Sequence, residues 1–237
     1  MSMLAASAAA GEAVPGWKWQ PPDDRPFPLV AWYGPGRGLL TDEVWRDVAE
    51  AGFNLCLPSF HGTTEEYRRT LDLGERYGIG LLLGGLVNWE WGEKPEKADD
   101  LVESLKERTE LYSSEPAFAA YVLKDEPHAV SFPALAHSRR LLARMDPGHW
   151  AYVNLFPNYA PVNERENYIG TRDYQEYVDL YMEVFRPEVL MYDHYCIEGY
   201  RFREADYAIR VRPEYYENLE IIRAAALKHG VPSGPSP

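Results

Sequence analysis

Six short apolar runs, separated by longer amphipathic stretches, constrain the fold of this chain more than any other feature. The runs begin 24 to 39 residues apart, and each is followed by a loop and then by a helical pattern. This alternation is typical of βα units that build a parallel sheet. The sequence therefore predicts six parallel strands, at residues 29–33, 53–57, 79–83, 118–123, 150–155 and 189–192.

The amphipathic stretches predict a helix after each strand. Thr41 provides an N-cap for the first helix, and Gly52 and Gly78 end the first two. Asp146-Pro-Gly148 ends the fourth helix, and Gly230 ends the last. The expected helices cover residues 41–51, 64–77, 98–112, 132–145, 171–185 and 213–229.

Nearly continuous apolar strands fit either a TIM-type (β/α)8 barrel or a doubly wound open sheet. An open sheet that binds a nucleotide usually has a G-x-G-x-x-G phosphate turn after its first strand. Here that turn is Gly34-Pro-Gly-Arg-Gly38, in which proline removes a backbone donor. The sequence favours an α/β fold of about six βα units, which is an incomplete barrel.

The proline-rich composition at both ends of the chain limits the expected barrel to residues 28–230. By the same spacing a seventh strand is due near residue 231, but residues 231–237 contain three prolines. We therefore expect a disordered tail there, with strands seven and eight missing. Residues 1–27 form a proline-rich lead-in, whose start resembles the region near a signal-peptide cleavage site. Extracellular, periplasmic and cytoplasmic locations all stay open.

The charge balance argues against two classes of partner. Asp and Glu total 37 against 24 Lys and Arg, a formal net charge of -13. This field opposes nucleic acids and anionic membranes and suits neutral substrates better. No apolar stretch is long enough to span a bilayer. Cys56 and Cys196 lie in or just after apolar runs, so we expect free thiols.

The loops after the strands hold the candidate chemistry, because a barrel places its functional residues at the carboxyl ends of its strands. Glu126 follows the fourth strand, where burial can raise its pKa so that it protonates a leaving-group oxygen. Asp125 is its neighbour and is expected to point the opposite way across the pleat. The alternative is that both carboxylates cap the next helix or pair with Lys124.

Three motifs resemble an uncharacterised branch of the glycoside hydrolase superfamily over roughly residues 28–230. They are Tyr121-Val-Leu-Lys-Asp-Glu-Pro127, Asn154-Leu-Phe-Pro-Asn158 and Tyr192-Asp-His-Tyr195. The resemblance implies an architecture similar to the retaining β-glycosidases, in which an Asn-Glu pair after strand four supplies the acid/base and a Glu after strand seven is the nucleophile. It places Glu126 on the acid/base, whereas Asp125 replaces the Asn and the nucleophile region is missing. A non-catalytic, carbohydrate-binding or inactive remnant is therefore the alternative.

Asp193, after the sixth strand, is the candidate replacement for the missing carboxylate. One strand separates it from the fourth strand, and this wider spacing suits an inverting pair of carboxyl groups. The alternative for Asp193 and His194 is a hydrogen-bonded pair that orders the barrel rim. His61 could approach both, but no metal-binding spacing supports a site, so we expect neither metal nor cofactor.

Aromatic and amide side chains at the same edge predict a carbohydrate-binding surface. Trp32, Trp89 and Trp91 are candidate platforms for pyranose rings, and at least one of them is expected to cover the barrel mouth as packing. An unclosed barrel also exposes two strand edges and part of its apolar interior, which predicts either a homodimer across the gap or poor solubility. The other expected substrate contacts are Tyr33, His61, Asn154, Asn158, Tyr192, His194 and Tyr195.

Overall fold

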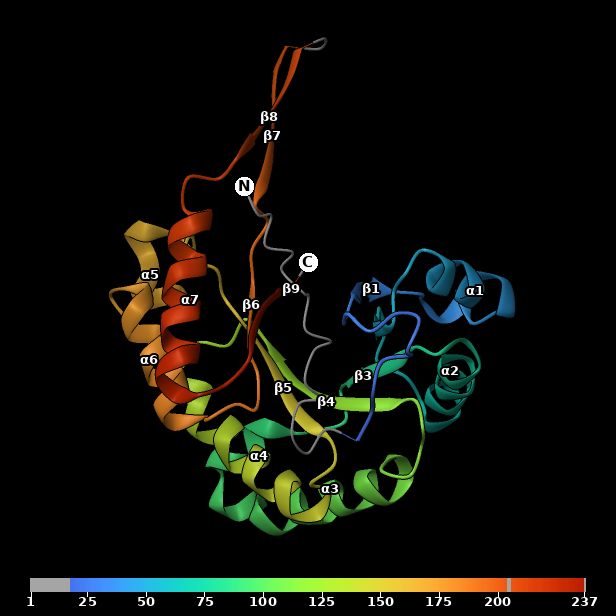
Figure 1. Ribbon diagram of the computed structural model, residues 1–237. Helices are drawn as coiled ribbons and strands as arrows, with labels where there is room; N and C mark the ends of the chain where they lie inside the picture. Colours follow the sequence, from blue (N-terminus) through green and yellow to red (C-terminus); the bar gives the residue numbers. More distant parts are fainter. Residues whose placement is uncertain (1–17, 204–205, 237) are drawn as a thin grey trace, which may run out of the picture.

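A curved parallel sheet forms the centre of the protein, and helices cover its outer side (Figure 1). The computed structural model describes residues 18–203 and 206–236. Neighbouring strands pair in parallel, and their order in the sheet follows their order in the chain. The strands are β1 (Val30–Gly34), β2 (Leu55–Pro58), β3 (Gly80–Gly84), β4 (Phe118–Asp125), β5 (Trp150–Leu155), β6 (Leu190–Asp193) and β9 (Ser233–Ser236).

Helices alternate with the first six strands, which confirms the α/β fold and the incomplete TIM-type barrel. The α-helices are α1 (Asp42–Glu50), α2 (Thr64–Tyr77), α3 (Ala98–Tyr112), α4 (Phe132–Met145), α5 (Arg165–Tyr168), α6 (Tyr174–Val184) and α7 (Tyr215–His229). Short 3-10 helices lie in the loops: η1 (Arg37–Leu39), η2 (Trp89–Glu93), η3 (Pro95–Lys97), η4 (Ala129–Ser131) and η5 (Val162–Glu164). Within the described part of the chain, no helix is both long enough and apolar enough to cross a membrane.

Local sequence signals set the ends of the first two helices. The Thr41 hydroxyl accepts a hydrogen bond from the Val44 backbone N–H, as expected for an N-cap. Thr63 and Glu66 form a capping box at the start of α2, and Gly78 ends that helix with a left-handed φ of 65°. These boundaries fix where β2 and β3 begin, and therefore where their carboxyl ends meet.

Two apolar layers enclose the sheet. The outer layer lies between the sheet and the helices and includes Trp45, Phe118 and Phe132. The inner layer lines the concave side and contains Trp19, Leu55, Leu82, Ala119, Ala120 and Tyr152. Trp19 leaves no room for a side chain at Gly80, where a Cβ would lie 2.4 Å from its ring. The segment before β1 thus supplies part of the barrel interior.

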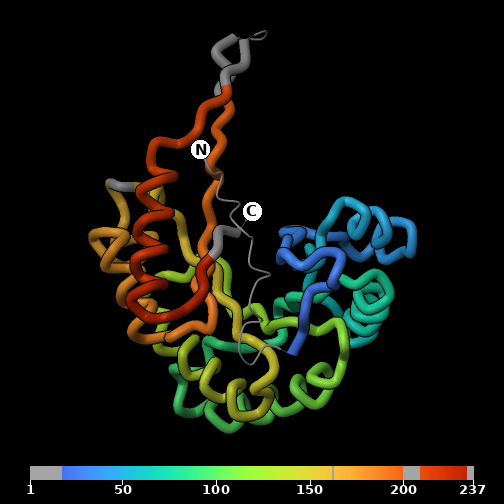
Figure 2. Tube along the Cα trace, in the orientation of Figure 1, coloured from blue at the N-terminus to red at the C-terminus, as the bar shows by residue number. Residues whose placement is uncertain are grey.

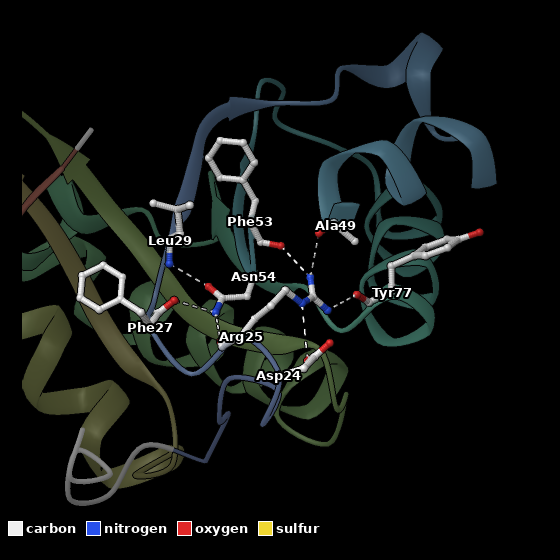
Figure 3. A network of polar contacts seen from close by, with 8 residues as sticks. All are labelled: Asp24, Arg25, Phe27, Leu29, Ala49, Phe53, Asn54 and Tyr77. Atoms are coloured by element: carbon white, nitrogen blue, oxygen red, sulfur yellow. Dashed lines mark hydrogen bonds and ion pairs between the residues drawn. The ribbon is translucent and has the colours of Figure 1, made fainter. Parts of the chain in front are cut away.

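A buried polar network joins the lead-in to the amino ends of the strands (Figure 3). The guanidinium of Arg25 donates to the carbonyl oxygens of Phe53 and Tyr77, each at 2.9 Å. The Asn54 side chain is fully buried, donates to two lead-in carbonyls and accepts from the Leu29 N–H at 2.8 Å. These bonds satisfy backbone groups that no strand pairs, and they hold the end of the lead-in against the barrel.

The expectation that residues 231–237 form no strand is wrong for residues 233–236. This segment is β9, which pairs in parallel with β6 and places Pro235 opposite Tyr192. Because β9 is an edge strand, it forms hydrogen bonds with one neighbouring strand only. A proline, which lacks the backbone N–H, is therefore tolerated there. The spacing of the βα units, which puts a seventh strand near residue 231, therefore predicted this strand better than the proline content of the segment did.

A two-stranded hairpin after β6 was not predicted from the sequence. It consists of β7 (Ile197–Arg203) and β8 (Asp206–Val211), which pair antiparallel and project from the body of the protein (Figures 1 and 2). Glu198, on one strand, forms ion pairs with Arg210 and Arg212.

Both cysteines are free thiols, as expected from the sequence. Cys56 is buried and Cys196 is partly buried.

Candidate active site

A bulge in β4 sets the direction of the first candidate carboxylate. The register between β4 and β5 shifts between Val122 and Lys124, so that Asp125 lies opposite Asn154. The Asn154 side chain is fully buried, and its Nδ2 donates to Asp125 Oδ1 at 3.0 Å. Bulges commonly re-aim side chains beside functional sites. Asp125 is therefore fixed by its neighbour strand rather than by simple alternation along β4.

Glu126 follows directly, in a backbone conformation that few non-glycine residues adopt. Its φ is +46°, and its N–H donates to the Asn154 carbonyl oxygen at 2.8 Å. Burial raises the pKa of Glu126 to about 7, and the negative charges of Asp125 and Asp193 contribute to the increase. A large share of Glu126 is therefore protonated at neutral pH, as a general acid requires.

Asp193 is the second carboxyl group with a raised pKa. It ends β6 and is only 5% exposed. Burial raises its pKa to about 6, the charge of Asp125 adds to this, and a hydrogen bond from the His194 backbone N–H opposes it. Asp125, Glu126 and Asp193 are thus close enough to influence one another electrostatically, and β4 and β6 together supply an acidic cluster.

His194 lies beside this cluster as a buried, neutral imidazole. Burial lowers its pKa, and the nearby Arg212 lowers it further. The ring meets Tyr159 and Tyr215 edge to face, with centroid distances of 4.9 and 5.2 Å. Neither ring nitrogen has a hydrogen-bond partner among the residues that the structure describes, so no side-chain pair with Asp193 forms. Both nitrogens are buried from solvent, so they are polar atoms that the described residues leave unsatisfied.

The hairpin contributes to the site through its base. The guanidinium of Arg212 lies over the Tyr159 ring, 4.1 Å from its centroid, and donates to the Tyr195 carbonyl oxygen at 3.0 Å. The Tyr195 N–H donates to the Tyr159 hydroxyl at 3.2 Å. Tyr195 is 55% exposed, and the charge of Asp193 raises its pKa. Tyr159 and Tyr195 therefore form one wall beside the acidic cluster.

A second part of the candidate site is a cleft at the carboxyl ends of β1 to β4, with a volume of about 820 Å³. The ammonium of Lys124 lies 5.8 Å from the centroid of the Trp89 ring. Asp125 lines the cleft as well, which links it to the acidic cluster. The cleft brings together five predicted site residues, namely Trp32, Tyr33, His61, Trp89 and Asp125.

Comparisons with known proteins agree with this geometry at the level of the fold. No protein-family model matches the chain, and no curated protein matches its sequence. The endo-beta-1,4-mannanase of Thermotoga petrophila matches its structure with a TM-score of 0.56 at 12% identity, over 94% of this chain and 61% of the mannanase. The beta-mannanase of the blue mussel Mytilus edulis matches with a TM-score of 0.50 at 10% identity, over 82% and 78%.

The chain shares its barrel fold with these two mannanases. At these identities the similarity concerns the fold alone, so the roles of single residues must come from their surroundings. In this barrel the structure gathers Asp125, Glu126 and Asp193 at the edge where barrels of this type carry their functional residues.

Six of the predicted contacts do not line the cleft: Asn154, His194 and Tyr195 lie beside the acidic cluster, and three others are packed elsewhere. Trp91 packs against the outer core and carries the Lys97 ammonium 5.4 Å from its ring, so it covers the rim as packing. The Asn158 side chain is buried and donates to the Glu214 carbonyl oxygen at 3.1 Å, which ties the loop after β5 to the start of α7. Tyr192 is fully buried in the outer core.

Sequence reasoning missed two residues of the candidate site. It considered Lys124 only as a partner of the adjacent carboxylates, although the structure places it in the cleft with Trp89. It did not single out Arg212, because the hairpin that positions this residue was not predicted. Alternating apolar and charged residues at 197–199 and 209–211 were the available signal. Within residues 18–203 and 206–236, no group of three or more His, Cys, Asp or Glu side chains is arranged to hold a metal ion.

Proposed function

We propose that this chain is a glycoside-hydrolase-like protein that binds carbohydrate and uses Glu126 as its general acid. The observation that supports this proposal is the raised pKa of Glu126, about 7, at the carboxyl end of the fourth strand. A carboxylic acid that stays protonated near neutral pH can donate its proton to a departing glycosidic oxygen. Asn154 assists by holding both the Glu126 backbone and the Asp125 carboxylate.

Asp193 is the second carboxyl group in this proposal. β9, the seventh strand of the sheet, has the sequence Ser-Gly-Pro-Ser and carries no carboxylate. Asp193 on β6 is the other buried carboxyl group near Glu126, and its ionised form would take a proton from the attacking water. The glycosidic C–O bond then breaks as Glu126 protonates the leaving oxygen, and the anomeric configuration is inverted.

The aromatic side chains would bind the sugar rings in the cleft next to the acidic cluster. Trp32 and Trp89 offer partly buried faces there, against which the C–H side of a pyranose can pack. Polar contacts to sugar hydroxyls would come from Tyr33 and His61 in the cleft and from the exposed Tyr195.

Hydrolysis of aryl glycosides and oligosaccharides by the full chain, compared with Glu126→Gln, tests the proposal. Glutamine keeps the size of the side chain but cannot protonate a leaving group, so kcat should fall about 10²–10⁴-fold. The matched control is Glu93→Gln, which makes the same change at an exposed position of η2 and should keep full activity. Equal activity of Glu126→Gln and the wild type would contradict the role of Glu126.

A non-catalytic carbohydrate-binding barrel is the second candidate function. The aromatic faces of Trp32 and Trp89 in the cleft favour it, because they would bind a sugar ring whether or not the carboxyl groups turn it over. On this alternative the wild type binds oligosaccharides but turns over none of them, and Glu126→Gln binds them with unchanged affinity.

A further inference from the structure

Lys124 is a partly buried cation that lacks an ion pair among the residues described and, unlike Arg165, also lacks a hydrogen bond to a carbonyl oxygen. Arg139 and Arg212 are also partly buried, and each pairs with a glutamate. Lys124 has no carboxylate within ion-pair distance among the residues described, even though Asp125 is adjacent in sequence. Its recorded partner is the Trp89 ring, 5.8 Å from the ammonium. The chain has an excess of acidic residues, so an unpaired ammonium in a cleft is not explained by a shortage of partners.

The side chains around Lys124 leave its positive charge without a counter-ion in the cleft. Asp125 also lines the cleft, but its Oδ1 already accepts from Asn154. Glu90, on η2, also lines the cleft, but it is exposed to solvent. The Trp32 and Trp89 rings line the same cavity. A partly desolvated ammonium next to aromatic faces gains most from an anionic ligand group that also presents an apolar ring face.

We propose that the cleft at β1 to β4 binds a sugar that carries a carboxylate, a uronic acid, with Lys124 as the partner of that carboxylate. The inference rests on the proposed carbohydrate function and specifies its substrate class. A pyranose stacked on Trp89 carries its C5 substituent at the ring edge, where a lysine stem can reach it. The C5 carboxylate of a uronic acid would pair with the ammonium, whereas the neutral hydroxymethyl group would leave the charge uncompensated.

The net charge of -13 does not decide against an acidic ligand. At physiological ionic strength the screening length is about 8 Å, so distant surface carboxylates act weakly in the cleft. The contact partner then dominates, and a charge-assisted hydrogen bond is about twice as strong as a neutral one. Neutral sugars, favoured by total charge alone, are the competing class.

Calorimetric titration with matched oligosaccharide pairs tests the inference on the full 237-residue chain. The pairs are oligoglucuronate and cello-oligosaccharides, oligomannuronate and manno-oligosaccharides, and oligogalacturonate and galacto-oligosaccharides, which differ in oxidation at C6. In at least one pair the acidic ligand should bind about tenfold more tightly. Lys124→Met should abolish this preference while keeping the neutral affinity, and Lys124→Arg should retain it.

Lys94→Met is the matched control, because Lys94 is exposed beyond η2 and should leave the preference unchanged. Thermal unfolding of each variant verifies that the chain is folded. Neutral ligands that bind as well as acidic ones would overturn the inference and leave the proposed function standing. Binding of neither class would remove both, and an acidic preference that survives in Lys124→Met would overturn the role of Lys124.

Discussion

At the scale of single residues, the site depends on carboxyl groups whose pKa values are raised by burial. Glu126, with a pKa of about 7, and Asp193, with a pKa of about 6, both receive a contribution from the charge of Asp125. Groups that interact in this way titrate as a pair. Between these two pKa values, Asp193 is mostly ionised while Glu126 is mostly protonated.

The first prediction concerns the pH dependence of activity. The proposed mechanism needs Asp193 ionised and Glu126 protonated, so kcat/KM should follow a narrow bell with apparent pKa values near 6 and 7. Asp193→Asn removes the group that titrates on the acidic side. The residual activity of this variant should therefore no longer fall as the pH is lowered through about 6. Initial rates of aryl glycoside hydrolysis from pH 4 to 9 measure this. A profile whose acidic limb is unchanged in Asp193→Asn would contradict the assignment.

The second prediction concerns stability. Because the folded-state pKa of Glu126 lies above its ordinary value of 4.5, the folded chain holds this proton more tightly than the unfolded chain. The stabilisation is complete below about pH 4.5 and is lost as the pH rises through about 7. Glu126→Gln lacks this loss, so its Tm relative to the wild type should be higher at pH 8 than at pH 5. A difference independent of pH, as expected for Glu93→Gln, would contradict the raised pKa.

At the scale of elements, long-range contacts join segments that look independent in the sequence. The lead-in is held to the amino ends of β2 and β3 by Arg25 and Asn54 (Figure 3). The hairpin β7–β8 reaches the site through Arg212, which covers the Tyr159 ring. Neither element is a strand of the barrel, yet each one positions part of it.

The third prediction follows from the lead-in network. Asn54→Ala leaves the carbonyl groups of Arg25 and Phe27 and the N–H of Leu29 without their partner. Each unsatisfied buried group costs about 1–3 kcal/mol, so the free energy of unfolding should fall by about 2–4 kcal/mol. Urea denaturation measures this loss. Asn163→Ala, at an exposed position, should change the stability by less than about 0.5 kcal/mol.

At the scale of the whole molecule, the parallel sheet has two edges. β1 and β9 are its end strands and pair with one neighbour each among the described strands. The concave layer includes Val30, Trp32 and Met191, which are only partly buried. Open edges and a partly exposed apolar layer favour association with another chain.

The fourth prediction is therefore a homodimer across the open edge. Leu29 lies just before β1 and is 38% exposed, so Leu29→Lys should shift the protein toward the monomer. Val102→Lys makes the same kind of change on α3, where Val102 is 40% exposed, and should leave the dimer intact. Sedimentation velocity over a range of concentrations distinguishes these states. A wild type that stays monomeric at all concentrations would contradict the prediction.

The sequence by itself determined the six βα units, since apolar periodicity and caps such as Thr41 act within a few residues. It also indicated which loops would meet, because parallel strands bring their carboxyl ends to one edge. Only the tertiary structure decided the bulge that sets Asp125 opposite Asn154 and the burial that raises the pKa of Glu126. It also decided the edge position that makes a strand of the proline-containing segment 233–236. Each of these depends on neighbours far away in the chain, and local patterns carry no information about them.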